Sequence, residues 1–242
     1  ILDGLVAQTG GLPRRLGILR DDRETLRAAM QAFDGDIMLT TGGTSTGKED
    51  HLPGLLAELG ELRVHGVNIR PAAPLGFGRL GRALAVLLPG NPVAAMVGFD
   101  LFVRPALQIQ LGQPEQRWNR RVRGRLRRKL ASALNRTDFV RVQLVGDGEV
   151  EPLRSGGAGV LTSVTRADGF VIVPRDDEGF EAGTEVEVYL FCWCLHGHVY
   201  EKRVPGTVIP SVFSASVPPK HAFRTRPRLK RRRRWGVRGS TS

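Results

Sequence analysis

Cysteine is scarce in this sequence, and two cysteines in 242 residues exclude a fold held together by several disulfides. The scarcity favours a reducing compartment, so we expect a cytoplasmic protein. Long apolar runs are also lacking, and no membrane span is expected. The first residues, ILDGLVAQTGG, lack the basic segment and cleavage motif of a signal peptide. Residue 1 is an isoleucine within a predicted helix, which predicts that the sequence is a fragment.

Both cysteines lie in the stretch FCWCLHGH, where Cys192 and Cys194 precede His196 and His198. Such a cluster could bind a metal, but zinc sites usually separate paired cysteines by two to four residues. Side chains at neighbouring strand positions also do not converge easily. Incidental spacing is therefore the preferred interpretation, and no metal site is predicted here.

Acidic residues are almost missing from the end of the chain, and this explains the formal net charge of +12. Residues 201–242 carry +11 of it, which leaves +1 for residues 1–200. The composition of residues 192–242 predicts a disordered, basic tail. An arginine run attracts nucleic acid or acidic surfaces, but only Trp235 offers a stacking ring beside it. A solvated extension is favoured, and a nucleic-acid partner is not expected.

The rest of the chain predicts an α/β fold in two parts. In the first part, residues 1–112, helical and strand patterns alternate, which indicates a layered α/β/α sheet with helices on both faces. The second part, residues 117–191, consists of short strand-like runs separated by Gly, Asp and Pro, and predicts a small, mainly β domain. The elements predicted in the first part are a helix ending at Gly10, a strand over 14–19, a helix over 23–33, a strand over 36–41, a helix over 52–60, a strand over 61–69, a hairpin turning near Gly81 and a helix over 91–112.

A glycine-rich loop follows the strand predicted over 36–41, in the stretch MLTTGGTSTGKED. Its glycines allow the backbone to approach a ligand and to present N–H groups to an anion, while the hydroxyls add donors. The P-loop pattern GxxxxGK[ST] is absent. The acids Glu49 and Asp50 would repel a bare phosphate but suit a divalent cation that bridges to one. A plain turn explains the pattern equally well.

A second turn, PGNP, follows the predicted hairpin in LLPGNPVAAM. Pro92 suits the first position of a helix, and the helix N-terminus directs partial positive charge above the sheet. Asp21 and Asp22 also follow a predicted strand, so they are expected on the same rim as Asp50. One of the pair is expected to cap the next helix. Three acids and two glycine turns on one rim predict a metal-assisted phosphate site.

Four stretches in order, LGILRDD, TTGGTSTGKED, NIRPAAPLGFG and LLPGNPVAAM, resemble motifs of the MoeA-type molybdopterin molybdenumtransferases, the family of the gephyrin E domain. That family's motifs are similar to SSGGVS-x-G-x-x-D, KPGKP and LPGNPVS, and the resemblance covers the C-terminal half of such an enzyme. It implies insertion of molybdate into adenylylated molybdopterin, with Mg²⁺-dependent release of AMP. It also implies a homodimer in the full-length form.

The resemblance assigns roles to individual positions. Asp50 matches the aspartate that binds Mg²⁺ or orients the metal centre, and Asp21 matches the first aspartate of the strand-end motif. Arg70 stands at the first lysine of KPGKP and keeps a positive charge for the oxyanion. Arg136 and Arg141 fall near positions that help to hold molybdate. The remaining matched positions bind the pterin substrate: Gly42, Gly43, Thr44, Ser45, Pro89, Gly90, Asn91, Pro92 and, more loosely, Ser163.

Three positions depart from the family pattern. Ala73 replaces the second lysine of KPGKP, Ala94 replaces the serine of PGNPVS, and His51 stands where Tyr or Phe is usual. The first two changes remove contacts to an oxyanion. They leave open an alternative of a different class, a non-catalytic scaffold or pterin-binding protein with the same fold.

Overall fold

The computed structural model describes residues 1–44, 50–113, 121–153 and 165–191. All of these residues belong to one compact unit, which extends from residue 1 to residue 205. The cluster at 192–198 and the basic tail lie outside the described residues.

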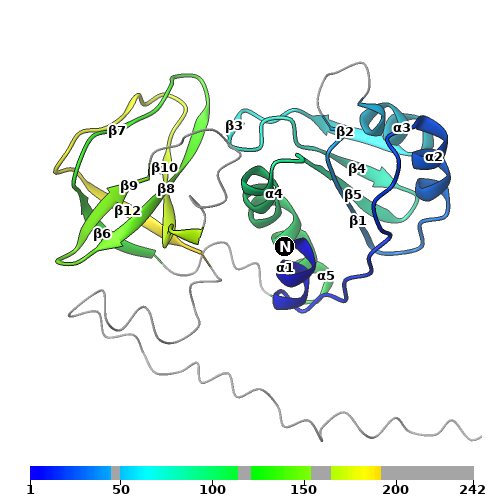
Figure 1. Ribbon diagram of the computed structural model, residues 1–242, viewed down its shortest axis with the longest axis horizontal. Helices are drawn as coiled ribbons and strands as arrows, with labels where there is room; N and C mark the ends of the chain where they lie inside the picture. The colour runs from blue at the N-terminus through cyan, green and yellow to red at the C-terminus, as the bar shows by residue number, and fades with distance from the viewer. Residues whose placement is uncertain (45–49, 114–120, 154–164, 192–242) are drawn as a thin grey trace, which may run out of the picture. The chain divides into compact units, whose positions relative to one another are not determined.

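A four-stranded mixed sheet forms the central layer of the first part of the chain (Figure 1). Its strand order is β1-β5-β4-β2, with β1 and β5 parallel and the other neighbours antiparallel. The parallel pairing places the carboxyl ends of β1 and β5 side by side, since Thr41 is in register with Leu88. The strands are β1 (Ile37–Thr41), β2 (Glu61–His65), β4 (Gly76–Leu80) and β5 (Ala83–Leu88).

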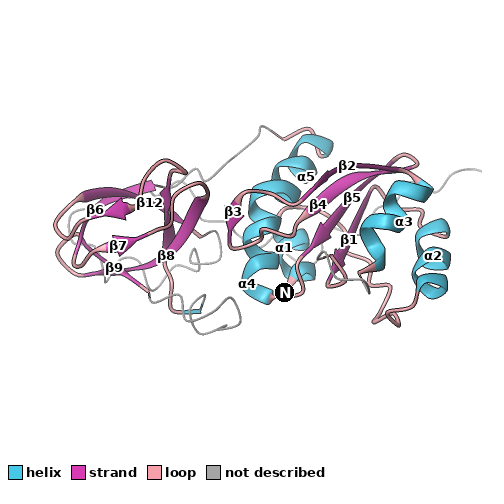
Figure 2. Cartoon of the chain, turned by 90° about the horizontal axis from the view of Figure 1, so that it is seen from above, coloured by secondary structure: helices cyan, strands magenta, loops and turns pink. Residues whose placement is uncertain are grey.

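Helices cover both faces of this sheet, as Figure 2 shows. One face carries α1 (Leu2–Gln8), α4 (Pro92–Gly98) and α5 (Arg104–Gln110), and the other carries α2 (Arg23–Gln31) and α3 (His51–Leu59). The strand β5 is buried on both sides because its residues alternate between two cores. Val86 and Leu88 pack with α1 and α4, whereas Ala85 and Leu87 pack with α2 and α3. The predicted α/β/α layering is confirmed.

The helices α4 and α5 join through a π-helical turn, η1 (Phe99–Val103), into one run over Pro92–Gln110. By length and composition alone this run could cross a membrane. Most of it is buried inside the protein, however, and α4 contributes residues such as Val93 and Met96 to the core. Its hydrophobicity is therefore that of a core helix.

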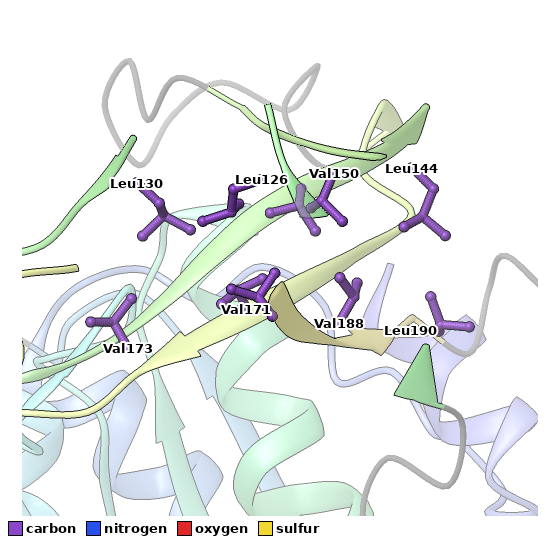
Figure 3. Close-up of a cluster of buried hydrophobic side chains, with 10 residues drawn as sticks. Leu126, Leu130, Leu144, Val150, Val171, Val173, Val188 and Leu190 are labelled. Atoms are coloured by element: carbon purple, nitrogen blue, oxygen red, sulfur yellow. The ribbon is translucent and has the colours of Figure 1, made fainter. Parts of the chain in front are cut away.

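Short strands make up the second part of the chain, as the sequence predicts. Their order is β10-β12-β6-β9-β8, and an additional pairing of β8 with β10 closes the ring into a small barrel. Valine and leucine side chains from all five strands fill its interior (Figure 3). The strands are β6 (Arg121–Leu126), β8 (Thr137–Val145), β9 (Glu149–Pro152), β10 (Gly169–Val173) and β12 (Glu185–Leu190); β7 (Leu130–Ala131) and β11 (Gly179–Phe180) form a separate pair.

The strand predicted over 61–69 is in fact two strands. β2 ends at His65, and Gly66 takes a φ of +84°, a left-handed conformation that interrupts a strand. The chain then enters β3 (Ile69–Arg70), which pairs in parallel with the start of β8. This short strand therefore belongs to the second sheet although it lies within residues 1–112. The division of the chain into one domain over residues 1–112 and another over residues 117–191 stays a prediction.

The prediction of a strand over residues 14–19 is wrong. Residues 11–20 form neither helix nor strand, and Leu12 and Ile18 are almost fully exposed. A strand requires a neighbouring backbone to complete its hydrogen bonds. Among the described residues no strand pairs with residues 14–19, so a strand there would leave its backbone hydrogen bonds unmade.

Candidate functional site

The glycine loop leaves β1 at the carboxyl end of the sheet. Gly42 and Gly43 take φ values of +86° and +62°, conformations that favour glycine. The Gly42 amide donates to the Leu88 carbonyl at 3.1 Å, which ties the loop to the end of β5. A Cβ placed on Gly90 would lie 3.2 Å from the Cα of Gly42, so the two turns are in backbone contact. The structure thus brings together two stretches that are 48 positions apart in the sequence.

The PGNP turn begins α4 with a complete N-cap. The Asn91 side-chain oxygen accepts hydrogen bonds from the backbone amides of Val93 at 3.1 Å and Ala94 at 3.3 Å. Pro92 occupies the first helical position, where its missing N–H costs nothing. Pro89 and Gly90 form the turn between β5 and this cap. The geometry assigns the side-chain amide oxygen of Asn91 a capping role.

The two aspartates of the RDD motif have different roles. The carboxylate of Asp22 caps α2 by accepting from the Thr25 amide and hydroxyl, both at 2.8 Å. These hydrogen bonds hold the pKa of Asp22 below its usual value. Asp21 instead faces the glycine loop, since a Cβ on Gly43 would lie 3.7 Å from Asp21 Oδ1. Asp21 therefore lies next to the predicted phosphate-binding loop.

Asp50 occupies the N-cap position of α3 without forming a capping bond through its side chain. Leu52, in the first turn of that helix, packs over Gly43, with 3.4 Å between its Cδ1 and the position of a Cβ there. The start of α3 and Asp21 thus both approach the same glycine. The Asp21 carboxylate beside this glycine, together with the acid at the start of α3, suits a hard divalent cation whose other ligands come from a substrate phosphate and water. Among the described residues no group of three or more His, Cys, Asp or Glu side chains forms a complete protein metal site.

A histidine that the sequence analysis did not single out also touches the loop. His65 Nε2 donates to the carbonyl oxygen of Thr44 at 2.9 Å, and Thr44 is buried. The two residues are 21 positions apart and belong to β2 and the loop after β1. The only signal in the sequence was the glycine after His65, because a glycine within a strand pattern indicates that the strand ends there.

A second cluster of charge surrounds a buried carboxylate on β8. Asp138 accepts a hydrogen bond from Arg136 Nε at 2.9 Å and lies 3.9 Å from Arg70. Arg141, also on β8, is buried, and burial lowers the pKa of its guanidinium, with a smaller contribution from the charge of Arg70. Two guanidinium groups, those of Arg136 and Arg70, thus share the carboxylate of Asp138. A surplus of positive charge in a partly desolvated place is suited to an oxyanion.

Some predicted positions lie apart from the glycine loop or outside the described residues. Arg70 contacts Asp138 on β8, in the second cluster rather than at the glycine loop. Ser45, Glu49 and Ser163 fall outside the described residues. Asp138 itself was missed by the sequence analysis; an acidic residue at a buried strand position was the available signal.

Comparison with known proteins finds two families that match successive parts of the chain. Residues 1–109 match the probable molybdopterin binding domain, and residues 123–191 match the MoeA C-terminal region, domain IV.

Individual relatives match over the same residues. A Methanocaldococcus jannaschii protein named for molybdopterin biosynthesis is 40% identical, over 78% of this chain and 46% of its own length. Molybdopterin molybdenumtransferase 1 of Mycobacterium tuberculosis is 32% identical, over 72% of this chain and 43% of its own length. The crystal structure of the molybdopterin biosynthesis MoeA protein from Pyrococcus horikoshii superposes with a TM-score of 0.66 at 34% identity, over 78% of this chain and 46% of that one. The chain spans about half the length of the curated relatives it matches.

Proposed function

Since residues 1–191 belong to the MoeA family, we propose that the chain takes part in molybdenum cofactor biosynthesis by inserting molybdenum into adenylylated molybdopterin, with release of AMP. The observation that carries the proposal is the convergence of the glycine loop, the turn at Gly90 and the carboxylate of Asp21 at one end of the sheet. An anionic pterin phosphate would be held there by backbone amides.

In this proposal the protein mainly positions its substrates. Gly42 and Gly43 would let the loop approach the pterin phosphate, and Asp21 and Asp50 would hold Mg²⁺. When bound, Mg²⁺ would neutralise the charge that develops as AMP departs. The carboxylates suit it, because Mg²⁺ in proteins usually uses one or two acids together with substrate phosphates.

Molybdate is the second substrate, and the cluster around Asp138 supports a place for it. Arg70 and Arg136 carry two positive charges against the one carboxylate of Asp138, which leaves positive charge available for an oxyanion. Arginine presents paired N–H donors that match the oxygens of a tetrahedral oxyanion. The lysine and serine that the family motifs place at positions 73 and 94 are alanines here. We therefore expect molybdate to bind more weakly than in relatives that retain them.

The direct test measures AMP release by the full chain supplied with adenylylated molybdopterin, molybdate and Mg²⁺. We expect release to require Mg²⁺ and to fall by at least about 100-fold in Asp50→Asn and Asp21→Asn, as is typical when charge stabilisation of a transition state is lost. Asp36→Asn is the matched control, since Asp36 is exposed at the opposite end of β1. Release that survives both site substitutions would refute the proposal.

A scaffold that binds the pterin without catalysis is the second candidate, favoured by the alanines at positions 73 and 94. It predicts tight binding of adenylylated molybdopterin with no AMP release. Restoring both side chains with Ala73→Lys and Ala94→Ser distinguishes the two functions. Activity gained only in that double variant would show that the chain itself is a binding protein.

Two further properties belong to the proposal. The resemblance implies a homodimer, and sedimentation analysis of the full chain measures it. A cytoplasmic location is expected from the scarcity of cysteine.

A further inference from the structure

His65 stands at the last position of β2, beside the glycine loop but outside every family motif considered above. Its Nε2 donates to the carbonyl oxygen of Thr44 at 2.9 Å. The edge of its ring packs on β4, because a Cβ on Gly76 would lie 3.4 Å from His65 Cδ2. The imidazole ring thus packs on β4, while its N–H holds the backbone that follows β1.

The described part of the loop, residues 42–44, is held at two points. The Gly42 amide donates to the Leu88 carbonyl at 3.1 Å, and His65 donates to the Thr44 carbonyl. Between these ties lie two glycines in left-handed conformations, which have more freedom to lose on ordering than any other residue. Fixing the backbone at residues 42 and 44 therefore reduces the conformational entropy that a ligand would otherwise have to remove from this segment.

We infer that His65 is a positioning residue for anion binding at the glycine loop, an inference that rests on the proposed function. A carbonyl oxygen that turned toward a bound phosphate would repel it, whereas amides in the same place attract it. By donating to Thr44, His65 directs that carbonyl toward β2.

Two substitutions separate the hydrogen bond from the packing of the ring. His65→Phe keeps a ring over Gly76 and removes the donor, whereas His65→Gln keeps a donor and removes the ring. Arg63→Gln is the control, since Arg63 is exposed two positions earlier on the same strand. The first measurement is amide hydrogen exchange over residues 42–44 in the ligand-free full chain. The second is the dissociation constant for adenylylated molybdopterin.

We expect His65→Phe to speed exchange over residues 42–44 and to weaken pterin binding, each by about 5- to 10-fold, as for the loss of one hydrogen bond. His65→Gln should recover most of both effects, and Arg63→Gln should match the unmodified chain. Exchange in His65→Phe equal to that of the unmodified chain would overturn the inference. So would unchanged pterin binding despite faster exchange. If the unmodified chain binds no pterin, the proposed function fails, and the exchange result alone decides whether His65 holds the loop.

Discussion

Individual residues decide how closely the two turns at the end of the sheet approach each other. The left-handed backbone at residue 42 favours glycine. Position 90 favours glycine for a different reason, because a Cβ there would press on the backbone of Gly42. Both glycines follow from sequence motifs. His65 and Asp138 do not, because their partners lie far away in the chain, and only folding shows that Thr44 and Arg70 are those partners.

The contact between the turns predicts the effect of Gly90→Ala. The added methyl group would lie 3.2 Å from Gly42 Cα, and the backbone must shift to admit it. We expect a loss of about 1–3 kcal/mol in the free energy of unfolding, measured in urea, as for other overpacked sites. Gly146→Ala, which meets nothing within 4 Å, should remain within about 0.5 kcal/mol. Equal stability of the two variants would contradict the close contact.

A buried ion pair between η1 and α5 gives a second prediction at this scale. Arg104 donates to Asp100 at 2.7 and 2.9 Å and to the Thr9 hydroxyl at 3.0 Å. We expect Arg104→Met to cost about 3–5 kcal/mol at pH 7, because it leaves a buried carboxylate uncompensated. Urea unfolding measures the loss, and the double variant Asp100→Leu/Arg104→Met should recover most of it.

The effect of Arg104→Met on the free energy of unfolding should depend on pH. Burial raises the pKa of Asp100, and the charge of Arg104 opposes this shift. An acid whose pKa is higher in the folded state destabilises the protein as pH rises through that value, and the penalty is relieved on acidification. In Arg104→Met the opposing charge is gone, so the variant should recover stability relative to the unmodified protein as pH falls from 7 toward 4. A loss that is constant over this range would contradict the assignment.

At the scale of helices and strands, local signals predicted most of the first sheet domain. One of Asp21 and Asp22 was expected to cap the next helix, and the structure shows that Asp22 does so; the cap at Asn91 was not predicted. The strand predicted over 14–19 was wrong because its apolar pattern says nothing about whether a neighbouring strand exists. The break at Gly66 could have been predicted, since glycine within a strand pattern signals an interruption. The pairing of β3 with β8 could not, because it joins segments 68 residues apart.

The cap of α2 predicts a second pH effect. Its hydrogen bonds to Thr25 lower the pKa of Asp22, so this cap stabilises the protein above the unfolded value of about 3.9 and loses its effect as pH falls through the folded value. We expect Asp22→Ala to lower the melting temperature at pH 7 and to lose this difference near pH 2. Asp22→Asn, which caps without a charge, should remain close to the unmodified protein at pH 7. A deficit in Asp22→Ala that is unchanged in acid would contradict the assignment.

At the scale of the whole described unit, the two sheets share one aromatic cluster. Val97 on α4 packs with Phe139, Phe170 and Phe191, and β3 adds Ile69 to the same cluster. Because this cluster and the β3–β8 pairing join residues from both sheets, the described residues should unfold together.

Substitution within the shared cluster tests this cooperativity. Phe170 contacts the rings of Phe139, Tyr189 and Phe191, with centroids 5.5–5.6 Å apart. We expect Phe170→Ala to cost about 3–5 kcal/mol and to lower a single melting transition by about 10 °C. Calorimetry of the full chain measures both. Two transitions, of which only one moves, would show that the sheets unfold independently.

The edge strand β1 is expected to promote aggregation of the protein at high concentration. Residues Ile37–Thr41 carry no charge and no proline, the features that usually discourage an edge strand from pairing with another molecule. The nearby stretch over residues 11–20 exposes Leu12 and Ile18. Concentrated stocks should therefore grow turbid on storage, and a lysine placed at Thr41 should delay the turbidity.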